Sequence, residues 1–112
     1  MIPTKYNITV FRGRDFLEDF IFYDDEENLL PIDTWVFKSE IREEECPESN
    51  LLASFTINVF PDESRISLNL TDQETLLLQE GTAYWDLLVT RGSMNESFLC
   101  GKVKIKCCVT EV

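Results

Sequence analysis

Carboxylates are the most abundant side chains in this sequence that could carry out chemistry. The chain has 21 acidic and 10 basic residues and no histidine, which gives a formal net charge of −11. Residues 24–28 offer a run of oxygens of the kind that calcium binds in sets of six to eight. Their spacing is not that of an EF-hand, and a solvated turn explains the same residues. We therefore predict no metal site, and the candidate ligands, if calcium binds, are Asp24, Asp25 and Glu27.

The residues that most enzymes use are missing. Without histidine the usual general base is absent, and no serine stands in a nucleophile elbow. Neither a phosphate-binding P-loop nor a dinucleotide-binding fingerprint occurs. Paired carboxylates alone could serve a hydrolase, but we expect these acids to lie in loops or on solvated strand faces, where their pKa values stay ordinary. The sequence therefore predicts a protein that is not an enzyme and that needs no cofactor.

The four cysteines are Cys46, Cys100, Cys107 and Cys108. They form no zinc motif, because neither a C-x-x-C pair nor a histidine accompanies them. Cys107 is predicted to be a small buried hydrophobe, whereas a disulfide between Cys46 and Cys100 stays open. The first residues lack the apolar stretch of a secretory signal, so we expect synthesis in a reducing cytoplasm.

Three lysines, Lys102, Lys104 and Lys106, follow one another at a spacing of two. On a strand this spacing puts all three side chains on one face. Two interpretations are open: lysines on an exposed edge strand prevent edge-to-edge pairing, or a basic strip meets the acidic loops of a neighbouring copy or of another partner. The net negative charge, in contrast, makes nucleic acid and anionic membranes poor partners.

The elements that position these residues are mostly strands, because apolar and polar residues alternate along most of the chain. The closing segment is predicted to turn Val103, Ile105, Cys107 and Val109 inward, after a loop at 91–97. Seven segments show the alternation, at 5–11, 15–23, 35–42, 52–60, 65–70, 82–90 and 98–110.

One segment departs from the strand pattern. Thr71 and Glu74 have the spacing of a capping box, which starts a helix, and Gly81 is a typical helix stop. A short helix is therefore expected near residues 72–79. The predicted fold class is all-β, an immunoglobulin-like antiparallel β-sandwich of about seven strands with this one helix, forming a single domain over residues 1–112.

Several apolar residues are left over when one face of each strand is assigned to the core. On 15–23 the second face is itself largely apolar, so we expect this strand to be covered on both sides. Single exposed apolar residues are normal, but several on one sheet indicate a surface that another chain covers. Together with the three lysines, the candidate contact residues are Leu17, Ile21, Tyr23, Val36 and Leu88.

Five short motifs occur in an order that is typical of one group of proteins. They are Gly13-x-Asp15-Phe16, Leu30-Pro31-Ile32-Asp33, Ile66-x-Leu68-x-Leu70-Thr71-x-x-Glu74-Thr75, Gly81-x-x-Tyr84-x-Asp86-Leu87 and Gly101-x-Val103-x-Ile105. Over residues 8–110 the chain resembles small β-sandwich structural proteins of tailed bacteriophages, including the N-terminal domain of baseplate upper proteins. It departs from their pattern at Leu30, where a glycine is usual, and at Thr34-Trp35.

The resemblance implies a non-enzymatic virion component that docks onto other virion proteins, including copies of itself. Its place would be the tail, the neck, the junction of baseplate and fibre, or the capsid decoration. We expect it in the virion, after synthesis in the host cytoplasm, with no nucleic-acid or membrane partner. The main alternative is a carbohydrate-binding or adhesin-type module, in which Trp35, Tyr84 or Tyr23 stacks on a sugar ring from an outer face. A secreted domain with glycans and disulfides is a third.

Overall fold

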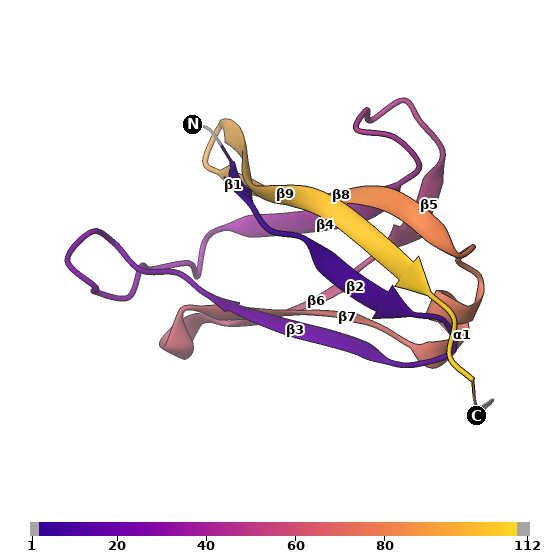
Figure 1. Ribbon diagram of the computed structural model, residues 1–112. Coiled ribbons are helices and arrows are strands. Elements are labelled where there is room, and N and C mark those ends of the chain that lie inside the picture. The colour runs from indigo at the N-terminus through magenta and orange to yellow at the C-terminus, as the bar shows by residue number, and fades with distance from the viewer. Residues whose placement is uncertain (1–2, 110–112) are drawn as a thin grey trace.

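The alternating segments pair into two sheets that face each other across one apolar layer (Figure 1). The computed structural model describes residues 3–109. Its strands and helices are β1 (Thr4–Lys5), β2 (Ile8–Phe11), β3 (Phe16–Ile21), β4 (Val36–Arg42), β5 (Leu51–Ser54), β6 (Thr56–Phe60), a 3-10 turn (Pro61–Glu63), β7 (Arg65–Leu70), α1 (Asp72–Leu76), β8 (Gly81–Arg91) and β9 (Met94–Lys106).

The predicted all-β sandwich is confirmed. One sheet has six strands in the order β1-β9-β8-β4-β5, with β2 also paired to β9, and the other has three in the order β3-β7-β6. All pairings are antiparallel except those of β1 and β2, which run parallel to β9. The first strands of the chain thus lie beside its last strand and form one edge of the larger sheet.

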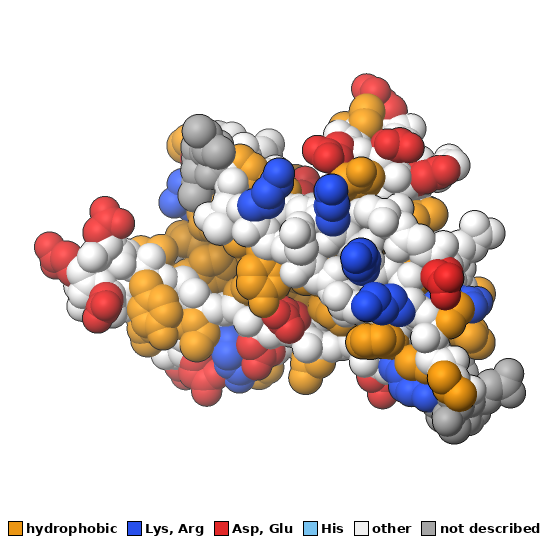
Figure 2. Space-filling model, viewed as in Figure 1, with side chains coloured by type: hydrophobic (Ala, Val, Ile, Leu, Met, Phe, Trp, Pro, Cys, Tyr) orange, Lys and Arg blue, Asp and Glu red, His pale blue; other side chains and the backbone are white. Residues whose placement is uncertain are grey.

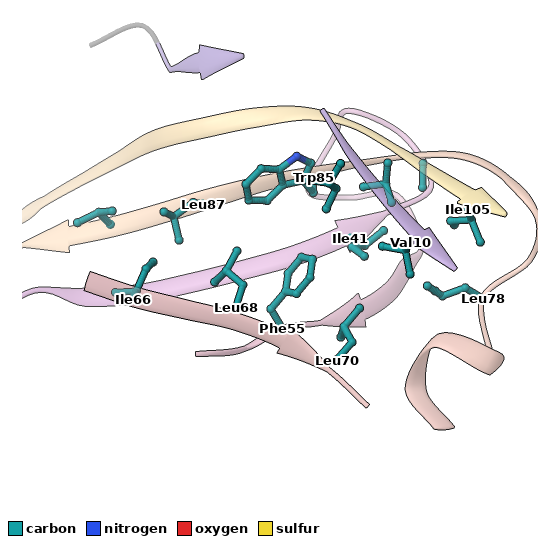
Figure 3. Packing of buried hydrophobic residues seen from close by; sticks show 14 of the residues in the cluster. Val10, Ile41, Phe55, Ile66, Leu68, Leu70, Leu78, Trp85, Leu87 and Ile105 are labelled. Atoms are coloured by element: carbon teal, nitrogen blue, oxygen red, sulfur yellow. The ribbon is translucent and has the colours of Figure 1, made fainter. Parts of the chain in front are cut away.

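The core lies between β7 of the smaller sheet and β8 of the larger one (Figure 3). Alternation predicts the inward side chains of both strands correctly. They are all 3% exposed or less: Ile66, Leu68, Leu70, Ala83, Trp85, Leu87 and Val89. Burial of this apolar face is what holds the two sheets together.

The corner between β7 and β8 contains the predicted helix. The Thr71 hydroxyl accepts a hydrogen bond from the Glu74 amide at 3.2 Å, and the Glu74 carboxylate accepts one from the Thr71 amide at 2.9 Å. The capping box is therefore present as predicted. The α-helix ends at Leu76, earlier than the predicted 79, and Leu78 turns into the core at 2% exposure.

The predicted strand 52–60 is two strands in different sheets. β5 pairs with β4 and β6 pairs with β7, and the chain changes sheet at Phe55, which is buried. The alternation runs unbroken through this crossover because both sheets turn their inner faces to one core. Of the residues expected inward, Ala53 and Ile57 are half-buried and Val59, on the edge strand, is 40% exposed.

The predicted strand 5–11 is also interrupted, between β1 and β2. The Tyr6 carbonyl turns inward and accepts a hydrogen bond from the Trp85 indole at 2.7 Å, while the Asn7 side chain accepts one from the Lys102 amide at 2.9 Å. Gly101 lies directly beneath this break, and a side chain there would overlap the Tyr6 carbonyl. The glycine is required because two backbones approach closely.

The end of the chain differs from the prediction in two respects. Residues 91–97 are not a loop, because β8 and β9 pair as far as Arg91 and Met94 around a two-residue turn at Gly92-Ser93. The inward alternation also stops when β9 ends at Lys106. Cys107 is exposed and Val109 fully so, because no strand pairs with them to hold them against the core. Thr110, the predicted strand end, lies outside the described residues.

Candidate functional site

A groove of about 700 Å³ lies on the outer face of the six-stranded sheet. Its floor is formed by outward side chains of β4, β8 and β9, with Lys5 from β1 at one side. Its wall is the loop between β4 and β5, which contributes Glu44, Glu45, Cys46 and Pro47. In Figure 1 this loop rises above the sheet beside β5. A concave surface of this size is large enough for a side-chain cluster or a small ligand.

Hydrogen bonds within the β4–β5 loop hold the groove wall in place. The Arg42 guanidinium donates to the Ser49 carbonyl at 2.7 Å, and the Glu43 amide donates to the Asn50 carbonyl at 3.0 Å. The Ser49 hydroxyl lies within hydrogen-bond distance of two further loop carbonyls, those of Glu44 and Cys46. The loop is therefore braced by its own backbone and by a side chain of the sheet that it overhangs.

The strand registers arrange the groove floor in rows. Glu40, Asp86 and Cys100 face one another across β4, β8 and β9. The next row toward the loop contains Arg42, Tyr84 and Lys102. On the other side of the acidic row lie Lys38, Leu88 and Ser97. The floor thus has two facing carboxylates between two rows that carry cations.

The two carboxylates have different surroundings. Glu40 is 18% exposed at its side chain and lies 3.0 Å from Arg42 and 3.8 Å from Lys38. Asp86 opens toward solvent, yet the groove partly desolvates its carboxyl and raises its pKa, and the negative charge of Glu40 raises it further. A hydrogen bond from Ser97 and the charge of Arg42 act in the opposite direction. The expectation that all the acids keep ordinary pKa values is therefore wrong for Asp86.

The lysine strip, Lys102, Lys104 and Lys106, continues from the groove along the outside of β9. All three side chains are exposed on one face, as the spacing predicts. However, β9 pairs with β8 on one side and with β1 and β2 on the other, so it is not an edge strand. The interpretation that these lysines protect an edge is wrong for this reason.

No ion pair or hydrogen bond of their side chains joins Lys5 or the lysine strip to any carboxylate within residues 3–109. This is notable in a chain with 21 acidic residues. Figure 2 shows the reason: Lys and Arg side chains form a row over β9, while red clusters lie at the tips of the β3–β4 and β4–β5 loops. The surface is segregated into a cationic strip and acidic tips.

The apolar contact candidates lie on both sheets. Leu17 and Ile21 are on β3 of the three-stranded sheet, 66% and 46% exposed, and Tyr23 follows at 54%. No part of the chain among residues 3–109 therefore covers the outer face of this strand. Val36, at 62% exposure, and the half-buried Leu88 lie on the six-stranded sheet. Since the two sets face away from each other across the sandwich, they do not form one surface.

The calcium candidates form the tip of the β3–β4 loop. Asp24 accepts hydrogen bonds from the amides of Glu26 and Asn28 at 2.8 and 2.9 Å, and hydrogen bonding to the loop backbone lowers its pKa. Its carboxylate thus stabilises the turn, while Asp25 and Glu27 are exposed. Residues 3–109 contain no group of three or more acidic, cysteine or histidine side chains that could hold a metal ion.

The structure brings together residues that the sequence does not associate. Glu40 and Asp86 are 46 positions apart, and alternation indicates only that each lies on a solvated face. Cys46 and Cys100 line the same groove as free thiols. The alternation does predict that Glu40, Asp86 and Tyr84 point outward. It does not show that the two strands carrying them are neighbours, so the sequence could not predict the groove.

No known protein family matches this chain, and no curated protein matches its sequence. Within residues 3–109 there is no helix of the length and apolar character needed to cross a membrane. The functional assignment therefore depends on the surface itself and on the motifs in the sequence.

Proposed function

We propose that the chain is a non-enzymatic docking module of a tailed-phage virion, which binds other virion proteins through the outer face of its six-stranded sheet. The observation that carries this proposal is the lysine strip beside the groove, whose cations have no partner in the described chain while the acids gather elsewhere. The resemblance of the motifs to virion β-sandwich proteins supports the proposal that the partners are virion proteins.

The partner surface that fits best is acidic, with apolar side chains that fill the groove. Unpaired lysines attract carboxylates and steer an acidic surface into register. Tyr84 and Leu88 give the groove floor apolar area on either side of the acidic row. A net charge of −11 disfavours nucleic acid and anionic membranes at long range. Copies of this chain offer acidic loop tips of this kind, and we propose that another virion protein with an acidic, partly apolar surface can bind in the same way.

The test is to look for the chain in purified phage particles and then to change the strip. Mass spectrometry of gradient-purified particles kept at low ionic strength should find the chain at a fixed copy number. The double variant Lys102→Glu, Lys104→Glu should fold but be lost from the particles, because it reverses the charge of the docking surface. Asn69→Glu, on the outer face of the other sheet, is the control and should be incorporated.

Either of two results would reject the proposal. The chain could be absent from particles purified at low ionic strength, or the double variant could be incorporated as efficiently as the control. Incorporation that weakens with rising salt would agree with a contact between exposed charges, since salt screens such contacts.

A carbohydrate-binding role is the second candidate, because Tyr84 lines the groove together with Asp86 and Glu40. An aromatic ring beside carboxylates is a common way to hold a sugar. Trp35, in contrast, packs edge-on against Phe22 and Phe98, with ring centroids 5.8 and 5.7 Å apart, at the end of the core. A glycan array comparing the protein with Tyr84→Ala would test this role, and the absence of any Tyr84-dependent signal would count against it.

A further inference from the structure

The strands β5 and β6 contain no charged residue. From Leu51 to Phe60 the chain contains no acid, base or proline, although 28% of all residues are charged. The two strands are the neighbouring edges of the two sheets, since β5 ends the larger sheet and β6 ends the smaller. Four apolar side chains are exposed along these strands, between 39% and 49%: Leu51, Leu52, Val59 and Phe60.

The backbone of β6 is free on one side. β6 pairs only with β7, and within the described residues no other backbone hydrogen bond reaches 56–60. A regular, uncharged edge strand of this kind is a template for another strand. The other edges are less suitable: β3 contains Glu18 and Asp19, β1 and β2 are interrupted at Tyr6-Asn7, and β5 has only four residues.

We infer that β6 pairs antiparallel with β6 of a second copy, around a two-fold axis at Asn58. This register places Ile57 opposite Val59 of the second copy and Thr56 opposite its Phe60. Ile57 and Val59 stand in register with the core residues Leu68 and Ile66 of β7, so apolar side chains meet apolar ones on the inner face. The two three-stranded sheets would join into one continuous sheet, an isologous contact in which both copies use the same surface.

Charge favours this side and this direction. Two copies that each carry −11 repel one another wherever their acids meet, and neither β5 nor β6 contains an acid. The turn that follows β6 contains Asp62 and Glu63. Antiparallel pairing puts the two acidic turns at opposite ends of the joined strands, whereas parallel pairing would put them side by side. A second copy bound antiparallel is therefore the occupant that the surface fits.

This inference goes beyond the proposed docking function, because it concerns the other sheet and uses none of the lysine strip. The two are separable by experiment. The variant Lys102→Glu, Lys104→Glu should leave the β6 contact intact, and a chain that lacks the β6 contact could still dock through its lysines.

Sedimentation equilibrium of the whole chain, from low micromolar to millimolar concentration, tests the inference. The mass should rise from 13.0 kDa to twice that value, and hydrogen exchange should slow at 56–60 as the dimer forms. Asn58→Lys should weaken the dimer about tenfold or more, because two ammonium groups then meet at the axis. Thr56→Lys, which in this register places the lysine opposite Phe60 of the second copy, serves as a second variant if Asn58→Lys does not fold.

Asn69→Lys is the matched control, since it makes the same substitution on the same outer face but on the central strand β7. It should dimerise like the unmodified chain. A chain that stays monomeric at the highest concentration would overturn the inference. So would a dimer that both β6 variants leave intact, or exchange protection that appears on β3 in place of β6.

Discussion

The two outer faces of this sandwich differ in how their basic side chains are paired with carboxylates. On the three-stranded sheet, Arg65 pairs with Asp19 at 3.3 Å and with Glu63 at 2.7 Å, and its guanidinium lies 4.0 Å above the Phe60 ring. On the six-stranded sheet, Lys5 and the lysine strip have no such partners among residues 3–109. Both sheets bury the same kind of apolar inner face. The smaller sheet therefore pairs its outer arginine within the chain, whereas the larger sheet pairs Arg42 and Lys38 with Glu40 but leaves the lysine strip without a carboxylate partner among residues 3–109.

Gly101→Ala should have the largest effect on this comparison, because it removes the support of the six-stranded face. The new methyl group would overlap the Tyr6 carbonyl and push β1 away from β9. We expect a loss of about 3 kcal/mol in the free energy of unfolding, at the upper end of what overpacking costs. Urea denaturation measures it.

Gly92→Ala is the control for that substitution. Its methyl group would meet nothing within 4 Å, although the backbone φ of +60° carries strain. The expected cost is about 1 kcal/mol. If the two alanine variants were equally stable, the close approach of the Tyr6 carbonyl to Gly101 would not be a feature of the folded chain.

Arg65→Ala and Lys104→Ala compare the two faces directly. Arg65→Ala loses two ion pairs and a ring contact and should cost about 1 kcal/mol. Lys104→Ala loses no partner and should change stability by less than about 0.5 kcal/mol. Thermal melts at low and high salt provide the measurement, and only the Arg65 effect should shrink as salt screens the ion pairs. A larger loss of stability for Lys104→Ala than for Arg65→Ala would contradict the difference in pairing between the two faces.

Asp86→Asn should give the smallest effect, and its sign depends on pH. The pKa of Asp86 is raised by desolvation and by Glu40, so the folded state holds that proton more tightly than the unfolded chain. Stability from this group is therefore lost as pH rises from the ordinary range of an aspartate through the raised value. Asp86→Asn should raise the denaturation midpoint at neutral pH and leave it almost unchanged in strong acid.

Asp24→Asn should behave in the opposite way. Backbone hydrogen bonds lower the pKa of Asp24, so its contribution is present at neutral pH and is lost as pH falls through the lowered value. Comparing the midpoints of both variants with those of the unmodified chain, from acid to neutral pH, isolates each group. If both variants shifted in the same direction, the different surroundings of the two carboxylates would not be real.

Alternation in the sequence predicts the inward residues of β7 and β8, and the capping-box spacing predicts where the corner helix begins. Ile66 on β7 and Trp85 on β8 follow from a period of two, which is a local property of a strand. The capping box of Thr71 and Glu74 is equally local, because both hydrogen bonds close within one turn. The all-β sandwich also follows from the spacing of such segments, whereas the parallel pairing of β1 and β2 with β9 departs from the antiparallel arrangement predicted.

The sequence pattern does not reveal which strands lie side by side, and the three-dimensional structure is needed to show it. Alternation cannot show that the chain changes sheet at Phe55, because the inward positions continue across the crossover. It cannot show that Cys107 is exposed, since that depends on where pairing with β9 stops. It also cannot show that Glu40 lies opposite Asp86, that Lys104 is on an inner strand or that β6 is an edge strand. The physical reason is that a side-chain pattern specifies a face, whereas neighbours are chosen by backbone hydrogen bonds between segments far apart in the chain.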